Sequence, residues 1–284
     1  MGTRLSWLVK QHSIDCVIAN VENICDGSGI SPPIYSKLKR YGVHLMSMGD
    51  HVYKRRDSLD LYRTQTDITR PANLGPDALG VQVAVHRLAD GTGIGLFTLL
   101  GRLNMKYADC FLRTADQMLA EVVPEDVRLV FVDMHAETSS EKIAVGWYLD
   151  GRVTCVFGTH THVQSADERL LPGATAYISD LGMTGPHNGV LGRRADRVIE
   201  HMITNMPTRF DIADGDVRIN GVIVEADAAS GRALRIERLS HAVPDSVLHG
   251  GLTGAEAEGD GPGPRESDGR SVAGSSSDRA HSLD

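Results

Sequence analysis

The sequence predicts an α/β fold in which mixed sheets are flanked by helices. Short apolar runs rich in β-branched residues recur along the chain, and such runs are typical of buried strands. Segments with helical spacing of apolar residues lie between several of these runs. Two pairs of runs follow each other closely and indicate hairpins. Alternating strands and helices, combined with hairpins, favour a mixed sheet or two packed sheets.

The first expected elements are a strand, a helix and a second strand. The run 15–21 has an apolar middle and is followed by polar residues, the pattern expected of a short buried strand. A helix is expected to begin at the Ser-Pro-Pro sequence 31–33, because proline suits the first helical turn. It should end ahead of Gly42, and the apolar run 43–48 is the next strand.

The middle of the chain predicts a hairpin followed by a helix and a strand. The runs 81–88 and 93–100 are strands joined by the turn Ala-Asp-Gly-Thr at 89–92. The segment 109–123 is helical in pattern, and the apolar run 128–134 is another strand.

One more helix is expected after Thr138-Ser-Ser-Glu141, which fits a capping box. Apolar residues follow at helical spacing, so Trp147 and Tyr148 are expected to be packing residues of this helix. The remaining predicted strands span 153–157, 175–178, 217–224 and 233–239, the last two as an antiparallel pair.

The composition predicts one domain over residues 1–245 and a disordered tail over 246–284. The apolar fraction of 41% suffices for a sizeable core. From about Gly250, small and charged residues dominate, and such a segment buries too little surface to offset its ordering entropy.

The charge and the cysteines narrow the class of protein. A formal net charge of −8 argues against holding a polyanion such as DNA along a broad surface, but it permits a small phosphodiester substrate. The four cysteines are irregularly spaced, which favours buried thiols in a reducing compartment. We expect a cytoplasmic protein without a membrane span or secretory signal, and the sequence leaves a homo-oligomer open.

Polar residues of ligand type follow four of the predicted strands, and strand ends of this kind converge on one crevice in α/β sheets. These residues are Glu22, Asn23, Asp50, His51, His135, His160 and His162. Oxygen and imidazole ligands in this mixture suit Mn, Fe or Zn better than Ca. In an extended chain, residues i and i+2 point to the same face, so His160 and His162 are expected to reach one site.

Each of these residues also has a purely structural interpretation. Glu22 fits a solvated charge after a strand, Asp50 a turn cap, and His135 a core histidine that donates to a carbonyl. An isolated H-x-H pair is weak evidence, because the chain holds 12 histidines. The metal interpretation is favoured because all four polar endings follow apolar strands.

At these residues the chain resembles the YmdB-like family of bacterial calcineurin-type metallophosphoesterases. The matching stretches cover most of residues 13–225, and the most specific are GTHTHVQ (158–164) and TAYISDLGMTGP (175–186). The resemblance implies the calcineurin-like fold and a phosphodiesterase acting on cyclic nucleotides such as 2′,3′-cyclic AMP. It also implies two metal ions, iron or manganese.

The resemblance assigns roles to the candidate residues. Glu22 is the carboxylate that bridges the two metals, and His51 is the general acid that protonates the departing ribose oxygen. The other ligands divide into Asn23 and His162 for one metal, and Asp50, His135 and His160 for the other.

The chain departs from the family pattern in three places. Asp50 stands where the family has Asn, and Val21 stands where it has Gly, which is expected to crowd the bridging loop. The family begins with a strand ending in Gly-Asp, whose Asp ligates the first metal, and we expect that segment roughly 20 residues before this chain begins. The alternatives are therefore a catalytically impaired metal-binding or signalling homologue and an amidohydrolase, although amidohydrolases carry H-x-H near the N-terminus.

Overall fold

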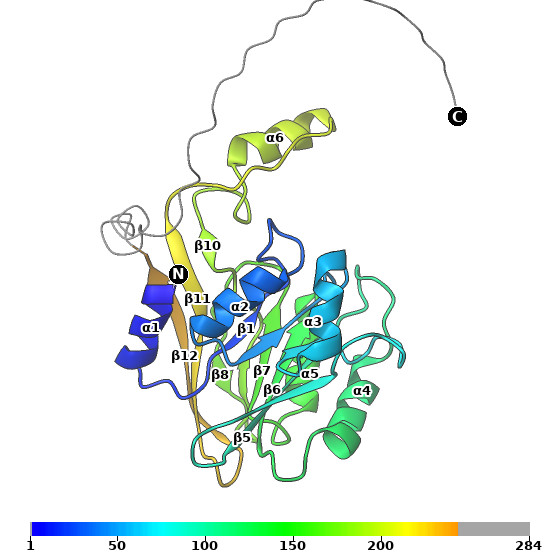
Figure 1. Ribbon diagram of the computed structural model, residues 1–284, viewed down its shortest axis with the longest axis vertical. Coiled ribbons are helices and arrows are strands. Elements are labelled where there is room, and N and C mark those ends of the chain that lie inside the picture. The colour runs from blue at the N-terminus through cyan, green and yellow to red at the C-terminus, as the bar shows by residue number, and fades with distance from the viewer. Residues whose placement is uncertain (1, 244–284) are drawn as a thin grey trace, which may run out of the picture.

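The structure is a computed structural model and describes residues 2–243. The predicted tail, 246–284, lies outside the described residues. Figure 1 shows a body of sheets and helices, from which α6 projects together with its connecting segments. The strands form a three-stranded sheet (β1-β2-β3), a six-stranded sheet (β4-β5-β6-β7-β9-β8) and a three-stranded sheet (β10-β11-β12).

The strands and helices fall close to the expected positions. The strands are β1 (Ile18–Asn20), β2 (Leu45–Ser47), β3 (Ile68–Thr69), β4 (Val83–Arg87), β5 (Gly93–Leu100), β6 (Leu129–His135), β7 (Cys155–Thr159), β8 (Arg169–Leu170), β9 (Ala176–Ile178), β10 (Gly185–Pro186), β11 (Val217–Ala226) and β12 (Ala233–Ala242). The helices are α1 (Gly2–Gln11), α2 (Pro32–Arg40), η1 (Arg56–Ser58), α3 (Leu59–Thr64), α4 (Phe111–Gln117), η2 (Met118–Val122), α5 (Ser139–Tyr148) and α6 (Ala195–Thr204).

The six-stranded sheet is mixed, as the sequence predicts. Its central strands β5, β6, β7 and β9 are parallel, and the outer strands β4 and β8 are antiparallel to their neighbours. Because the central strands are parallel, β6 and β7 end side by side, with His135 paired opposite Thr159. The predicted pairs β4–β5 and β11–β12 are both antiparallel.

The small sheet of β1, β2 and β3 is parallel and lies against the large sheet, with β1 at its edge. Asp133 of β6 joins the two sheets. Its Oδ2 accepts hydrogen bonds from Asn20 Nδ2 at 3.0 Å and from Ser47 Oγ at 2.6 Å. Asp133 is fully buried, so these bonds fix how the ends of β1 and β2 lie against β6.

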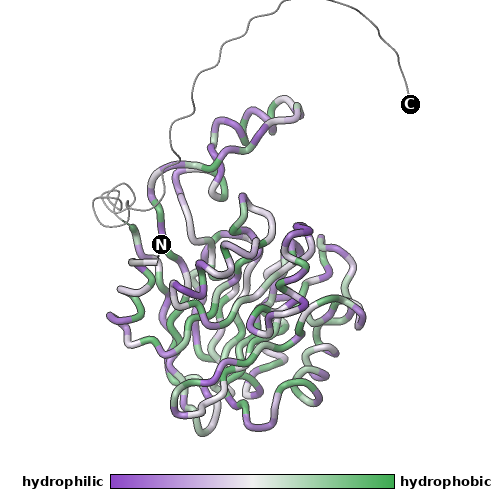
Figure 2. Tube along the Cα trace, viewed as in Figure 1, coloured by the Kyte–Doolittle hydropathy of each residue, from purple (hydrophilic) through white to green (hydrophobic). Residues whose placement is uncertain are grey.

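The apolar core lies mainly on the two faces of the large sheet. Figure 2 shows the hydrophobic segments running through the strands of the body. One cluster includes Phe97, Val132 and Tyr177, and a second cluster packs α2 against the small sheet. Val21 belongs to this second cluster and is 3% exposed, so its side chain packs into the core.

The packing prediction for α5 was wrong. The helix starts at the expected position, after Thr138, but Trp147 and Tyr148 are 54% and 39% exposed. The buried face carries Glu141, Lys142, Val145 and Gly146. A Cβ on Gly146 would overlap the Tyr177 ring, so this face approaches the sheet too closely for large side chains.

The capping box of α5 is also formed differently from the prediction. Thr138 Oγ1 donates to Glu141 Oε2 at 2.9 Å, but the Thr138 side chain makes no hydrogen bond to the helix backbone. Glu141 Oε1 accepts instead from the backbone amides of Arg102 and Leu103, at 2.8 and 3.2 Å. The carboxylate therefore binds a loop of the large sheet.

Several elements were not expected from the sequence: the helices α1, η1, α3 and α6 and the two-residue strands β3, β8 and β10. For α6 a signal was present, because Val198, Ile199, Met202 and Ile203 recur at helical spacing. None of the described helices is long and apolar enough to cross a membrane.

Candidate metal centre

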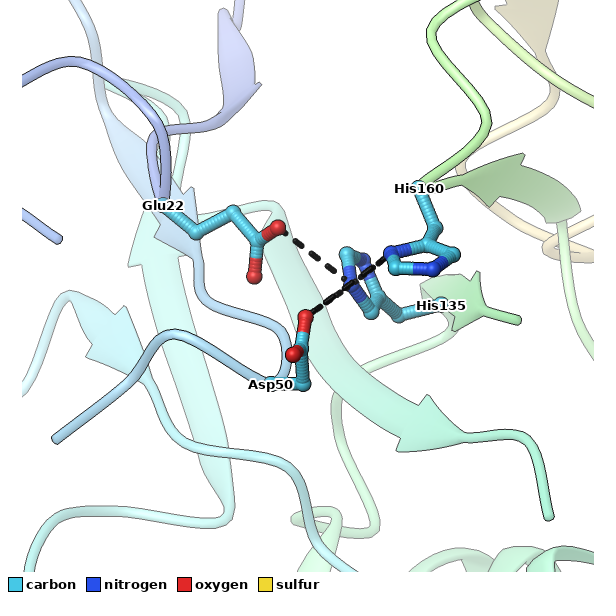
Figure 3. A group of neighbouring side chains, drawn as sticks. All are labelled: Glu22, Asp50, His135 and His160. Carbon is cyan, nitrogen blue, oxygen red and sulfur yellow. Dashed lines mark hydrogen bonds and ion pairs between the residues drawn. The ribbon is translucent and has the colours of Figure 1, made fainter. Parts of the chain in front are cut away.

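Four side chains predicted as metal ligands meet in one cluster, Glu22, Asp50, His135 and His160 (Figure 3). One ligand atom from each lies within 4.8 Å of the others. His135 Nε2 is central, at 3.3 Å from both Glu22 Oε1 and Asp50 Oδ1. His160 Nδ1 lies 3.1 Å from His135 Nε2 and 3.7 Å from Asp50 Oδ1.

The fold delivers these residues from four strand ends. Glu22 and Asp50 follow β1 and β2 of the small sheet, His135 is the last residue of β6, and His160 directly follows β7. The four strands are parallel within their sheets, so their carboxyl ends face one crevice. The predicted convergence is therefore what the structure has.

The cluster fits a metal ion in its donor chemistry and its shape. It combines two carboxylates with two imidazoles, a ligand set common for Mn, Fe and Zn. Glu22 and His135 are each 1% exposed, yet no cation side chain pairs with Glu22 among the described residues apart from histidine. A Cβ on Gly49 would overlap Glu22 Oε2 and His135 Nε2, so glycine leaves the room that the ligand atoms need.

A hydrogen-bond chain sets the orientation of the His135 ring. Thr159 Oγ1 donates to Asp133 Oδ1 at 2.6 Å and lies 2.8 Å from His135 Nδ1. Because the hydroxyl donates to the carboxylate, it accepts from the Nδ1–H group of His135. The Nε2 atom is then directed at Glu22 and Asp50, as a metal-ligating imidazole requires.

The charges of the cluster shift the pKa values of its members. Burial alone would lower the pKa of His135, but its hydrogen bond to Asp50 and the charges of Glu22 and Asp133 raise it overall. The hydrogen bond from His135 holds the pKa of Asp50 well below its usual range. Burial lowers the pKa values of His160 and His162, which favours the neutral form that binds metals.

Asn23 and His162 form a pair beside this cluster. Asn23 Nδ2 donates to Glu22 Oε1 at 3.2 Å and lies 3.0 Å from His162 Nε2. Asn23 Oδ1 faces the ring of His51, 2.9 Å from its Nδ1. The backbone amide of His51 also donates to Glu22 Oε2 at 3.3 Å. Glu22 therefore belongs to the four-residue cluster and also contacts Asn23 of this pair. The backbone amide of His51 binds the same carboxylate.

The H-x-H segment is not extended, which corrects the sequence prediction. His160 and His162 have positive φ values of 96° and 67°, a region that residues other than glycine rarely adopt. Asp180 stabilises this backbone: its Oδ2 accepts from Thr161 N at 3.2 Å and Thr161 Oγ1 at 2.7 Å. The turn, rather than alternation along a strand, directs both imidazoles toward Glu22.

Lys142 balances the buried charge of Asp180. Its Nζ lies 2.6 Å from Asp180 Oδ2, and both side chains are almost fully buried. Breaking such a pair leaves an uncompensated buried charge. The ion pair with Asp180 therefore accounts for the burial of Lys142, and through Asp180 it supports the turn that carries the two histidines.

Sequence reasoning missed the residues that orient the ligands. These are Asp133, Glu137, Lys142, Thr159 and Asp180, and Glu137 Oε2 lies 3.1 Å from His160 Nε2. For Asp133 and Asp180 a signal was present, because a charged residue inside an apolar run requires a partner when buried.

We expect metal binding to release a proton at pH values below the pKa of His135, because a metal ion must displace the proton from the ring and the surrounding carboxylates raise that pKa. Below the pKa of His135, the apparent affinity for the metal ion should therefore rise with pH, by up to about tenfold per pH unit. Calorimetric titration with Mn²⁺ in two buffers of different ionisation enthalpy measures the release. Equal heats in both buffers would contradict this assignment.

The fold and the cluster together define an α/β protein with a candidate metal-ligand centre at the carboxyl ends of its strands. The chain belongs to the YmdB-like protein family, whose model matches residues 1–239. This finding confirms the family and the fold class expected from the sequence.

Known relatives agree with this membership. The chain is 38% identical over 222 residues to the 2′,3′-cyclic-nucleotide 2′-phosphodiesterase of Bacillus subtilis, covering 78% of this chain and 83% of that protein. A crystal structure of a hypothetical protein from Thermus thermophilus matches with a TM-score of 0.79 and 32% identity, over 86% of this chain and 93% of the other. A phosphatase from Mycoplasma pneumoniae matches with a TM-score of 0.76 and 32% identity, over 87% and 90%. The predicted enzyme class, a phosphoric diester hydrolase, agrees with the names of the first and third of these proteins.

Proposed function

We propose that the chain is a metal-dependent phosphodiesterase that hydrolyses 2′,3′-cyclic nucleotides or similar small phosphodiesters. The observation that carries the proposal is the cluster of Glu22, Asp50, His135 and His160, with Asn23 and His162 beside it. The relative from Bacillus subtilis, by its name, cleaves the 2′ ester of a 2′,3′-cyclic nucleotide. Cleavage of that ester leaves the phosphate on the 3′ oxygen.

The ligands divide between two metal ions in this proposal. Asp50, His135 and His160 would hold one ion, Asn23 and His162 would hold the other, and Glu22 would contribute to both. The donor set suits manganese, iron or zinc, and the family resemblance favours iron or manganese among these. When bound, such a pair of ions makes hydroxide available near neutral pH and neutralises charge on the phosphoryl oxygens.

His51 is the candidate general acid. Its backbone amide is bound to Glu22, and its Nδ1 lies 2.9 Å from Asn23 Oδ1, so the ring is held beside the ligand cluster. The Nε2 atom lies 3.8 Å from Asp50 Oδ2. The ring is partly exposed, so a substrate oxygen can approach it. In this position it would protonate the leaving ribose oxygen.

Asp50 adds a negative charge to the centre. Its pKa lies well below the usual range, so it is ionised at neutral pH. A second anionic ligand beside Glu22 strengthens the attraction for a cation. We expect the centre to hold its metals at least as firmly as one with a neutral amide at this position.

The test uses the full 284-residue chain, stripped with a chelator and reloaded with Mn²⁺, Fe²⁺ or Zn²⁺. We expect two metal equivalents, hydrolysis of 2′,3′-cyclic AMP to 3′-AMP, and loss of turnover on stripping. A 3′,5′-cyclic nucleotide and a generic aryl phosphodiester test selectivity. Metal-loaded protein that cleaves none of these substrates would overturn the proposal.

One observation favours a second function, a metal-binding homologue without turnover. Only four ligand atoms among the described residues gather within 4.8 Å, which is enough for one metal ion. Under this alternative the stoichiometry is one equivalent and the reloaded protein is inactive. The same measurement therefore separates the two functions.

A further inference from the structure

A groove lies beside the metal centre and is formed by the loop 101–110, which connects β5 to α4. It has a volume of about 620 Å³, within the usual range of roughly 300–1,000 Å³ for small-molecule sites. Its lining includes Arg102, Met105, Lys106, Tyr107 and Phe111. None of these residues has a role in the chemistry proposed above.

The loop is held at both ends by one buried amide. Asn73 Nδ2 donates to the carbonyls of Leu100 and Asp109, at 2.9 and 3.0 Å, and Asn73 Oδ1 accepts from Leu100 N at 2.8 Å. Glu141 binds the backbone amides of Arg102 and Leu103, as described for α5. The backbone at both ends of the loop is therefore fixed, which restricts where its exposed side chains can lie.

The loop lies next to the ligand cluster at two points. Its first amide, Gly101 N, donates to the carbonyl of His135 at 2.9 Å. Further along, Lys106 Nζ lies 3.4 Å from the carbonyl oxygen of Asp50. These two contacts place the loop that forms the groove against the backbone of two candidate ligands.

The exposed side chains of the loop suit the rest of a nucleotide. Tyr107 is 87% exposed, and it is an aromatic ring that the folded protein leaves uncovered. Arg102 and Lys106 make no ion pair with any described residue, although the chain carries a net charge of −8. Uncovered cations beside an anion-binding centre attract a phosphate ester, and an aromatic ring offers a stacking surface to any base.

We propose that this groove is the nucleoside subsite, in which Tyr107 stacks on the base and Lys106 faces the phosphate side of the substrate. The subsite rests on the proposed function for its substrate class. It predicts a preference for phosphodiesters that carry a base over cyclic phosphodiesters of similar reactivity that lack one.

The experiment compares Tyr107→Ala with Tyr107→Phe, which keeps the ring, on metal-loaded full-length protein. We expect Tyr107→Ala to raise the KM for 2′,3′-cyclic AMP about tenfold and to leave kcat nearly unchanged. The Phe variant should match the unmodified protein. For glycerol 1,2-cyclic phosphate, which has no base, the three proteins should have the same kcat/KM. Equal losses on both substrates, or no loss on either, would overturn the subsite.

A binding measurement separates this proposal from the proposed activity. Calorimetry with 3′-AMP and inorganic phosphate requires no turnover. We expect Tyr107→Ala to weaken 3′-AMP binding about tenfold and phosphate binding not at all. If the unmodified protein cleaves no cyclic nucleotide but this difference persists, the activity is wrong and the subsite stands. Identical binding of 3′-AMP by the two proteins refutes the subsite, whatever the activity.

Discussion

Gly49→Ala is expected to remove metal binding and, with it, nearly all turnover. An added Cβ would overlap Glu22 Oε2 and His135 Nε2, so the ligand atoms must separate. The His135 ring cannot yield easily, because Thr159, which is itself bonded to Asp133, holds its other nitrogen. Glu22 would therefore move away, and the four-residue cluster would lose the carboxylate that it shares with the pair of Asn23 and His162. Metal content after dialysis, together with the rate on 2′,3′-cyclic AMP, measures the effect.

The matched control is Gly75→Ala. A Cβ on Gly75 meets no atom within 4 Å, and the substitution leaves the centre untouched. We expect this variant to keep its metal and its rate. Thermal unfolding of metal-free Gly75→Ala should agree closely with that of the parent, since Gly75 lies outside the helices and strands and its Cβ would meet no atom. A Gly49→Ala protein that retained full metal content would show that the cluster is not the metal site.

His51→Ala is expected to lower kcat by about 10²–10⁴, the usual contribution of a general acid, with the metal content unchanged. The physical reason is that His51 lies beside Glu22 and Asn23 but outside the cluster of four ligand atoms. Its removal costs a proton donor and leaves the ligands in place. The rate and the metal content are measured on the same preparation.

Two controls make this result specific to proton donation. His12→Ala removes an exposed histidine whose side chain makes no hydrogen bond or ion pair with a candidate ligand among the described residues, and it should change neither quantity. His160→Ala removes a ligand and should lower both the metal content and the rate. In addition, a substrate with a good leaving group, such as a nitrophenyl diester, needs less protonation, so His51→Ala should slow it less. A rate within a few-fold of the parent on 2′,3′-cyclic AMP would remove His51 from the mechanism.

Some parts of the fold around the candidate centre are specified by the local sequence, whereas others depend on contacts between distant segments. The large sheet was predictable because β5 and β6 are mainly apolar runs, and a run of this length indicates a buried strand by its own composition. The candidate ligands Glu22 and His135 were predictable for the same reason, since each stands where such a strand ends. The family motif around His160 then added which strand ends belong together.

The H-x-H turn illustrates a local pattern that tertiary contacts overrode. Alternation along an extended strand predicted the right destination for His160 and His162 but the wrong backbone. Asp180, which lies 19 residues beyond Thr161 in the chain, binds that threonine and stabilises the left-handed conformation on either side of it. No property of the three-residue segment alone indicates that partner.

The sequence by itself determined the fold class, most of the longer strands and the polar residues that follow four of them, because hydrophobic period and strand termini are local properties. Only the tertiary structure decided which face of α5 is buried, how Thr159 orients His135, and that Asn73 holds the loop bearing Tyr107 next to the centre. Each of these depends on a close approach between segments distant in the chain. How closely two distant segments pack, and which hydrogen bonds they form, is set when the sheets assemble. No local sequence pattern encodes these contacts.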